Sequence, residues 1–162
     1  MKIGVMSDSH GRIDYIDKAV ELAGKVDMWL FLGDVRSDSD YLEATGEVPV
    51  VAVLGNNDWT RGNLKDEELL TVEDVTIFLS HGHYLGVRTG TEIFAKYARE
   101  QGATVGLYGH SHIADKHMEH GVLVLNPGSV ALPRDARDPS FLLLEVAGGE
   151  VLGAEHVFFE LD

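Results

Sequence analysis

Seven side chains that can bind a metal ion follow short apolar runs of the sequence. They are carboxylates, an amide and imidazoles, whose oxygen and nitrogen atoms suit a divalent ion such as Mn, Fe, Zn, Co or Ni. The chain has no cysteine, which excludes a thiolate metal site and a cysteine nucleophile. In chain order the seven are Asp8, His10, Asp34, Asn56, His81, His110 and His112.

These side chains are too many for one ion and its waters, but they suit two ions about 3.5 Å apart that share a carboxylate and a hydroxide. We expect Asp34 to be the shared carboxylate. Water held between two dications becomes a hydroxide at neutral pH, and that hydroxide can attack the phosphorus of an ester. The cations and imidazoles would stabilise the charge that develops on the phosphoryl oxygens. The predicted chemistry is metal-dependent hydrolysis of a phosphate ester.

The elements that must position these residues begin as alternating strands and helices. Residues 2–7, 28–32 and 48–54 are apolar runs, typical of parallel strands buried on both faces. The spacing of apolar residues predicts helices over residues 12–23 and 92–101. Ligands of α/β sheets bind beyond the carboxyl ends of the strands, so we expect the seven side chains to converge there.

The rest of the chain is typical of strands joined by tight turns. The predicted strands cover residues 69–72, 75–80, 105–108, 116–125, 141–146 and 151–159.

Composition is that of an ordinary globular protein. With 162 residues, of which 44% are hydrophobic, and no repeat or linker, we expect a single domain over residues 1–162. The formal net charge of −14 repels polyanions, so general nucleic-acid binding is not expected, whereas a small phosphate ester is allowed. The N-terminal segment is typical of neither a secretory signal nor a membrane span, which predicts a cytoplasmic protein without a membrane partner. The oligomeric state stays open, and a homo-oligomer is allowed.

Each polar residue taken alone has an ordinary explanation, because a single His or Asp after a strand is usually a hydrogen-bonded loop residue. Only the ordered set points to a metal site. We interpret His117 and His120 as surface residues and His156 as structural. Arg134 and Arg137 are interpreted as solvated loop arginines rather than phosphate ligands.

Five short motifs contain all of these candidate ligands. They are Asp8-Ser9-His10, Gly33-Asp34, Gly55-Asn56-Asn57-Asp58, His81-Gly82-His83 and Gly109-His110-Ser111-His112. In this order they resemble the signature blocks of the calcineurin-like metallophosphoesterases. The short length and the segment Asn126-Pro127-Gly128-Ser129 are similar to the small bacterial and archaeal phosphodiesterases of that superfamily, whose eukaryotic relative is the retromer subunit Vps29.

The resemblance implies an α/β fold in which two packed mixed β-sheets are flanked by helices. It also implies a phosphodiesterase with two divalent metal ions as cofactors, Mn²⁺ being expected first and Ni, Co, Fe or Zn being alternatives. One ion would be held by Asp8, His10, Asp34 and His112, and the other by Asp34, Asn56, His81 and His110.

Asn57 departs from the family pattern. Many superfamily members have a histidine there, which is usually assigned to protonating the leaving group or binding the phosphate. An amide cannot donate a proton at neutral pH, so esters with good leaving groups are the expected substrates, and His83 becomes a candidate for phosphate contact or proton donation. Asp58 is a candidate for orienting Asn57 or the metal loop, with a plain turn or cap role as its alternative.

Two other functions stay open. A non-catalytic metal-binding scaffold of the Vps29 type would use the same fold, but it would have no physical need for seven complete ligands. A phosphomonoesterase or nucleotide hydrolase would differ from a phosphodiesterase mainly in its leaving group.

Overall fold

Strands and helices alternate at first and strands dominate later in the computed structural model, which describes residues 1–58 and 62–161. In chain order the elements are β1 (Lys2–Met6), α1 (Ile13–Ala23), β2 (Met28–Phe31), α2 (Arg36–Thr45), β3 (Val50–Ala52), β4 (Glu67–Val72), β5 (Val75–Ser80), the 3-10 helix η1 (His83–Leu85), α3 (Glu92–Glu100), β6 (Val105–Leu107), β7 (Asp115–Glu119), β8 (Val122–Asn126), β9 (Ser140–Ala147) and β10 (Glu150–Phe158).

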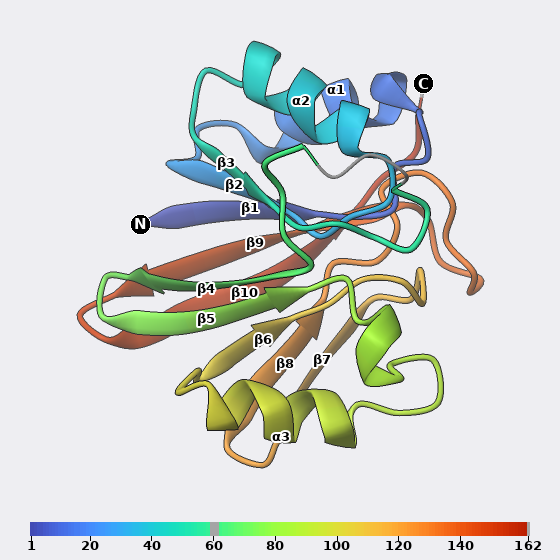
Figure 1. Ribbon diagram of the computed structural model, residues 1–162. Coiled ribbons are helices and arrows are strands. Elements are labelled where there is room, and N and C mark those ends of the chain that lie inside the picture. Colours follow the sequence, from blue (N-terminus) through green and yellow to red (C-terminus); the bar gives the residue numbers. More distant parts are fainter. Residues whose placement is uncertain (59–61, 162) are drawn as a thin grey trace.

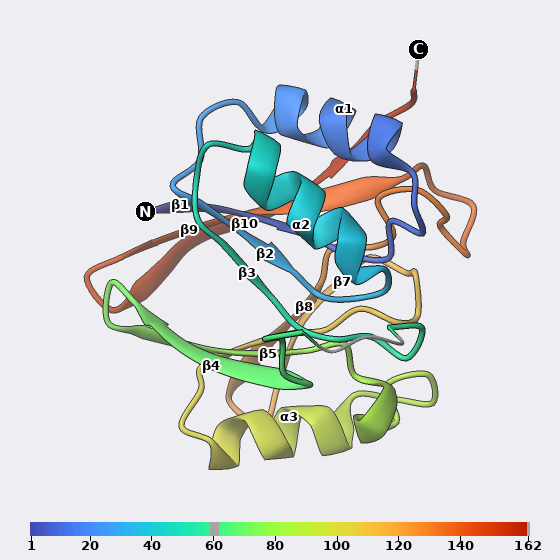
Figure 2. The same ribbon diagram turned by 45° about the horizontal axis from the view of Figure 1, so that its top comes forward.

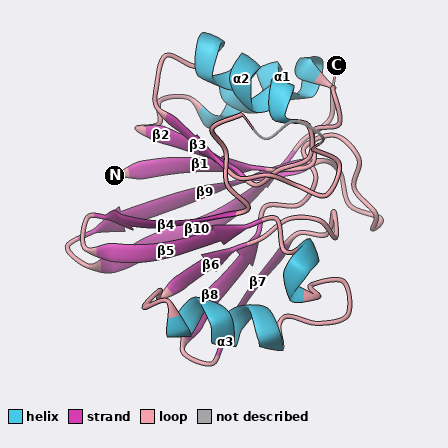
Figure 3. Ribbon diagram, in the orientation of Figure 1, coloured by secondary structure: helices cyan, strands magenta, loops and turns pink. Residues whose placement is uncertain are grey.

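Two five-stranded sheets pack against each other, and helices cover their outer faces (Figure 1). The first sheet has the strand order β10-β9-β1-β2-β3 and the second has the order β4-β5-β6-β8-β7. Helices α1 and α2 contact each other above the first sheet (Figure 2), and α3 lies on the second (Figure 3). The predicted architecture of two mixed sheets flanked by helices is confirmed.

Parallel pairing includes every strand that leads to a proposed ligand and one further strand, β8. Strand β2 pairs in parallel with β1 and β3, and β6 pairs in parallel with β5 and β8. The hairpins β4–β5, β7–β8 and β9–β10 are antiparallel. The predicted segment 116–125 is therefore two strands, of which β8 joins the parallel set.

The buried side chains form three clusters that correspond to the contacts between layers. Because successive side chains of a strand point to opposite faces, Ile3 and Val5 pack between the sheets while Met6 packs toward α1 and α2. Phe94 of α3 packs on the second sheet. Ile93, which the helical spacing placed on the same face as Phe94, is instead 65% exposed.

No helix among the described residues is long and apolar enough to cross a membrane.

Candidate metal centre

The proposed ligands lie at one end of the two sheets, where parallel strands end. Asp8, Asp34 and Asn56 follow β1, β2 and β3 of the first sheet. His81 and His110 follow β5 and β6 of the second sheet. Side chains from the two sheets meet there, since His81 Nε2 lies 3.0 Å from Asn56 Oδ1. The expected convergence at the carboxyl ends of the strands is thus observed.

Most of these residues have an unfavourable backbone conformation. Residues other than glycine seldom adopt a positive φ, and each instance costs on the order of 1–3 kcal/mol. Such strain collects where the surrounding structure and a functional requirement maintain it. Five of the seven proposed ligands have positive φ: Asp8, His10, Asp34, His110 and His112.

Two glycines allow the ligand loops to approach each other closely. Gly33 has a φ of 100°, and a Cβ atom there would lie 2.7 Å from the backbone nitrogen of Gly55. A Cβ atom at Gly55 would overlap the carboxylate of Asp34. The motifs Gly33-Asp34 and Gly55-Asn56 therefore need glycine because their backbones are in contact.

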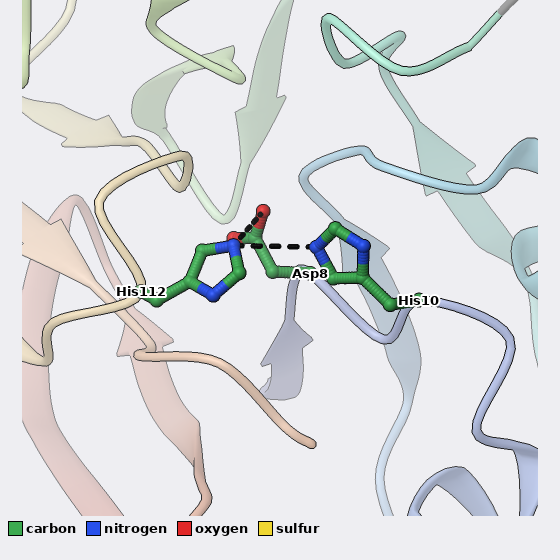
Figure 4. Close-up of side chains that lie close together, drawn as sticks. All are labelled: Asp8, His10 and His112. Atoms are coloured by element: carbon green, nitrogen blue, oxygen red, sulfur yellow. Dashed lines mark hydrogen bonds and ion pairs between the residues drawn. The ribbon is translucent and has the colours of Figure 1, made fainter. Parts of the chain in front are cut away.

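Asp8, His10 and His112 form one group of side chains (Figure 4). His112 Nε2 lies 3.3 Å from Asp8 Oδ1 and 3.3 Å from His10 Nε2. The other oxygen, Asp8 Oδ2, accepts hydrogen bonds from the Ser7 hydroxyl group and from the backbone N–H of His110. Asp8 Oδ1 is buried and has no hydrogen-bond donor among the described residues.

Asp8, Asp34 and His81 form a second group. His81 Nε2 lies 3.6 Å from Asp34 Oδ1 and 3.7 Å from Asp8 Oδ1. His110 Nδ1 adjoins this group, 3.3 Å from His81 Nε2 and 3.1 Å from Asn56 Oδ1. Asp8 is thus a member of both groups, whereas the family pattern implied that only Asp34 is shared.

Asp34 belongs to the second group and also approaches the first. Its Oδ1 faces His81, and its Oδ2 lies 3.8 Å from His10 Nε2. The side chain is only 2% exposed. The two carboxylate oxygens of Asp34 therefore face one imidazole from each group.

Two imidazoles are oriented by backbone carbonyls. Nδ1 of His81 lies 2.7 Å from the Leu32 oxygen, and Nδ1 of His112 lies 2.7 Å from the Leu132 oxygen. A carbonyl oxygen can only accept, so each Nδ1 carries the proton and each Nε2 keeps its lone pair. Metal-ligating histidines are held in this way in many proteins.

The donor set fits a metal ion. In the neutral rings the lone pair of His81 Nε2 points at the Asn56 oxygen, and that of His112 Nε2 points at Asp8 Oδ1. Contacts between acceptors are repulsive unless a cation or a proton lies among them. Burial makes the repulsion stronger, because His81 and Asp8 are fully buried.

Comparison with known proteins gives the family. The calcineurin-like phosphoesterase superfamily domain matches residues 1–149. The chain belongs to the calcineurin-like phosphoesterase superfamily. It is 35% identical over 145 residues to the probable metallophosphoesterase YsnB of Bacillus subtilis, covering 89% of this chain and 83% of that protein.

Two further relatives of the chain have names that describe different functions. A phosphodiesterase of Methanocaldococcus jannaschii is 32% identical over 149 residues, which cover 79% of this chain and 83% of that protein. The crystal structure of Vps29 from Entamoeba histolytica, complexed with Zn²⁺, has a TM-score of 0.76 and 26% identity, with 99% of this chain and 100% of that chain covered. The relatives of this chain thus include a protein named as a phosphodiesterase and a Zn²⁺-bound Vps29 protein.

The electrostatics of the candidate site differ between the two groups. Burial works against an ionised Asp8, but the hydrogen bond of His112 and the nearby imidazole charges outweigh it and hold the pKa of Asp8 below its ordinary value. Burial likewise works against a charged His112, but Asp8 outweighs it and raises the pKa of His112. Burial, and then His81, lower the pKa of His110 to about 4.

Asn57 contacts Asp34 twice. Its side-chain N–H donates to Asp34 Oδ2 at 2.9 Å, and its backbone N–H donates to Asp34 Oδ1 at 3.0 Å. The residue that replaces the family's histidine therefore orients the proposed bridging carboxylate.

Asp58 is held by backbone groups. Its carboxylate accepts hydrogen bonds from the backbone N–H groups of Val35 at 3.0 Å, Arg36 at 2.6 Å and Gly55 at 2.7 Å. These bonds connect the loop that follows β2 with the loop that follows β3. Because Arg36 begins α2, the same bonds also cap that helix, so they fit both the metal-loop and the cap alternative for Asp58.

His83 borders the site at the start of η1. Its ring centroid lies 5.4 Å from that of His81 and 6.1 Å from that of His110. Burial, and then the charge of His81, lower the pKa of His83, so the ring is neutral at pH 7. A neutral imidazole is a poorer proton donor than an imidazolium but can still donate a hydrogen bond.

Asp38 was missed by the sequence reasoning. This buried residue in the first turn of α2 accepts hydrogen bonds from the Ser9 hydroxyl group at 2.5 Å and from the Gly11 N–H at 2.8 Å. Asp38 therefore binds the loop at Ser9 and Gly11, the two residues on either side of His10. A hydrophilic residue in an unrecognised helix gave no sequence signal for this role.

The remaining histidines lie away from the proposed ligands. His156 Nε2 donates to the Asn126 carbonyl at 2.6 Å, which confirms its structural role. His117 is partly exposed on β7 beside Asp115 and Glu119, and His120 is exposed. Both agree with their interpretation as surface residues.

Proposed function

We propose that this chain is a dinuclear metal-dependent phosphodiesterase. The observation that carries the proposal is the position of Asp34, whose two carboxylate oxygens face two separate groups of converging ligands. Asp8, His10, Asp34 and His112 would hold one ion, and Asp34, Asn56, His81 and His110 the other. The proximity of Asp8 Oδ1 to His81 makes Asp8 a further contact between the two groups.

When bound, the two ions would activate a water for attack on phosphorus and neutralise charge on the phosphoryl oxygens. Asn57 orients Asp34, and Asp58 fixes the loops that carry Asp34 and Asn56. These contacts preorganise the carboxylate without taking part in proton transfer.

Leaving-group protonation has no strong donor among these residues. The Asn57 amide is not an acid, and the lowered pKa of His83 leaves that imidazole neutral at pH 7. His83 is accordingly assigned to phosphate contact through a hydrogen bond. Esters with acidic alcohols, such as phenols, are the substrates that this site would cleave best.

The test is hydrolysis of bis(p-nitrophenyl) phosphate by chelator-treated protein to which Mn²⁺, Ni²⁺, Co²⁺, Fe²⁺ or Zn²⁺ is returned. We expect activity with Mn²⁺ and two ions per chain by elemental analysis. Asp34→Ala and His112→Ala should each lower kcat/KM by at least about a hundredfold. His120→Ala changes an exposed histidine in the turn between β7 and β8 and serves as the matched control. Activity that persists without added metal, or in Asp34→Ala, would contradict the proposal.

A metal-binding scaffold is the second candidate, because the Zn²⁺-bound Vps29 protein shares this fold at 26% identity. A scaffold would bind two ions and lose them in Asp34→Ala but would show no metal-dependent hydrolysis. A phosphomonoesterase would instead cleave p-nitrophenyl phosphate faster than the diester.

A further inference from the structure

Two arginines differ from the others in having no partner for their guanidinium groups. Arg88 and Arg134 are exposed and form no side-chain hydrogen bond or ion pair within the described residues. Every other arginine in that part of the chain contacts a carboxylate or a carbonyl group: Arg12 with Asp14, Arg36 with Asp40, Arg99 with the His120 oxygen and Arg137 with Asp135.

Both unpaired arginines lie beside the proposed ligands. The backbone N–H of Arg134 donates to the His112 oxygen at 3.3 Å, and the Leu132 oxygen in the same loop binds His112 Nδ1. Arg88 follows η1, the turn that begins with His83. The two loops, one between η1 and α3 and one between β8 and β9, lie at the same end of the sandwich (Figure 1).

The two arginines adjoin the same ligand loop, His110–His112, from two different loops of the chain. The backbone of Arg134 is bonded to His112, and Arg88 lines a groove together with Ser111.

A groove of about 320 Å³ adjoins the ligand loop. It is lined by Arg88, by Ser111 within the loop, and by the exposed side chain of Ile113. Asp115 also lines it, but the Tyr108 hydroxyl group donates to that carboxylate at 2.9 Å. The groove offers room and a cation to the part of an ester beyond the phosphoryl group.

The acidity of the whole chain makes these two cations significant. A formal net charge of −14 repels anionic substrates over a Debye length of about 8 Å at physiological salt. Unpaired guanidinium groups near the ligand loop would offset part of this repulsion and present several donors to a phosphate or carboxylate.

We propose that Arg88 and Arg134 are specificity-determining residues that bind a second anionic group of the substrate, so that the preferred phosphodiesters carry a phosphate or carboxylate on one alcohol. This inference rests on the proposed phosphodiesterase function. It revises the interpretation of Arg134 as a solvated loop residue, and it leaves Arg137, which is paired with Asp135, without a role in binding.

The test compares two substrates that share a leaving group. One is the p-nitrophenyl phosphodiester of 4-hydroxybutyrate, which has a carboxylate, and the other is the diester of 4-hydroxybutyramide, which has none. We expect wild type to prefer the carboxylate in kcat/KM. Arg88→Ala or Arg134→Ala should reduce this preference about threefold each, and the double variant about tenfold. Arg88→Lys and Arg134→Lys should retain part of it, and 0.5 M NaCl should weaken it.

Arg99→Ala is the matched control, because it removes an arginine of α3 that contacts the His120 carbonyl instead of the site. The control should keep the full preference. A double variant that still prefers the carboxylate ester, or a wild type with no preference, would overturn the inference.

A binding measurement separates this inference from the proposed function. Calorimetry of the Mn²⁺-loaded protein should show tighter binding of 3-phosphonopropionate than of butylphosphonate, with the difference lost in the double variant. If wild type hydrolyses neither ester but shows this difference, the proposed function fails and the anion site stands. If wild type binds both phosphonates equally, the anion site is refuted whatever the activity.

Discussion

Asn57 occupies the position at which many calcineurin-like phosphoesterases have a histidine, and its amide is bound to Asp34 instead of being free to act on a leaving group. We predict that Asn57→His makes the enzyme less dependent on leaving-group acidity. A general acid contributes typically about 10²–10⁴-fold, and an imidazole without a dedicated partner should contribute about tenfold on poor leaving groups. The measurement is the slope of log(kcat/KM) against phenol pKa for a series of aryl phosphodiesters, which should become shallower.

Asn57→Ala is the control for this experiment. It removes the hydrogen bond to Asp34 Oδ2 without supplying an acid, so rates should fall for all esters while the slope stays that of wild type. A folded Asn57→His variant with an unchanged slope would show that the position does not reach the leaving group.

In the metal-free protein, the pKa values of His110 and His112 should be shifted in opposite directions from the ordinary histidine value. The pKa of His110 is lowered to about 4, mainly by burial, whereas Asp8 raises the pKa of His112. Between pH 4 and about 6.5 the unfolded chain therefore binds a proton at His110 that the native state does not, and this residue destabilises the fold as pH falls. His112 contributes the opposite sign, since its stabilising charge is present at low pH and is lost as pH rises through its raised pKa.

These shifts also affect metal loading. Metal must displace a proton from His112 near neutral pH but not from His110. Nitrogen-detected NMR of the imidazoles across pH 4–8 measures both titrations, and calorimetry in buffers of different ionisation enthalpy measures the proton released. Equal pKa values for the two histidines would contradict the prediction.

At the scale of elements, the sequence predicted the strands that carry the ligands because each is a continuous apolar run. Strand β1 was expected to end one residue later than it does, and α1 and α3 were close to their observed bounds. Helix α2 was not predicted. Its sequence, RSDSDYLEAT, is hydrophilic, and Leu42 is the one fully buried apolar side chain among its residues. Tertiary contacts with the first sheet maintain a helix whose sequence has little amphipathic pattern.

The site was predictable to the extent that its residues are metal ligands. Asp34 and His81 carry their chemistry in their residue types, so motif spacing was sufficient to find them. The residue type of Asp38 does not reveal its role. In the sequence, an aspartate that accepts hydrogen bonds from a loop looks the same as any surface aspartate. The contact of Asp38 with Ser9 depends on the long-range packing of α2.

The unpredicted helix has a function that can be tested through Asp38. Asp38→Asn weakens the acceptor for Ser9 and Gly11, and Asp38→Ala removes it and leaves buried donors unsatisfied, which costs on the order of 1–3 kcal/mol. Because this carboxylate orients the His10 loop, metal affinity should fall about 10- to 100-fold. Urea unfolding and metal titration measure the two effects.

Asp40→Asn is the matched control on the same helix. Its carboxylate is 58% exposed and lies 3.9 Å from Arg36, so stability should change by less than about 0.5 kcal/mol. The prediction for Asp38 fails if its variants bind metal as wild type does.

At the scale of the whole molecule, metal binding should determine thermal stability. The fold brings the acidic ligands Asp8 and Asp34 together with imidazoles in a buried space, within a chain of formal charge −14. An ion that binds the native state stabilises it by about 2.7 kcal/mol at a free concentration 100 times its dissociation constant. With roughly 2–4 °C per kcal/mol for a chain of this size, two ions should raise Tm by about 10–20 °C.

The comparison is Tm in EDTA against Tm in Mn²⁺, by calorimetry. Asp34→Asn should fold in EDTA, because the amide is isosteric and removes one buried carboxylate, but it should lose most of the rise in Mn²⁺ because the shared ligand is gone. His120→Ala should keep the full rise. Mg²⁺ should give a smaller rise than Mn²⁺, since four of the seven proposed ligands are imidazoles, which Mg²⁺ binds weakly. An equal rise in wild type and Asp34→Asn would mean that the stabilising ions bind elsewhere, and the assignment of Asp34 as the shared ligand would be wrong.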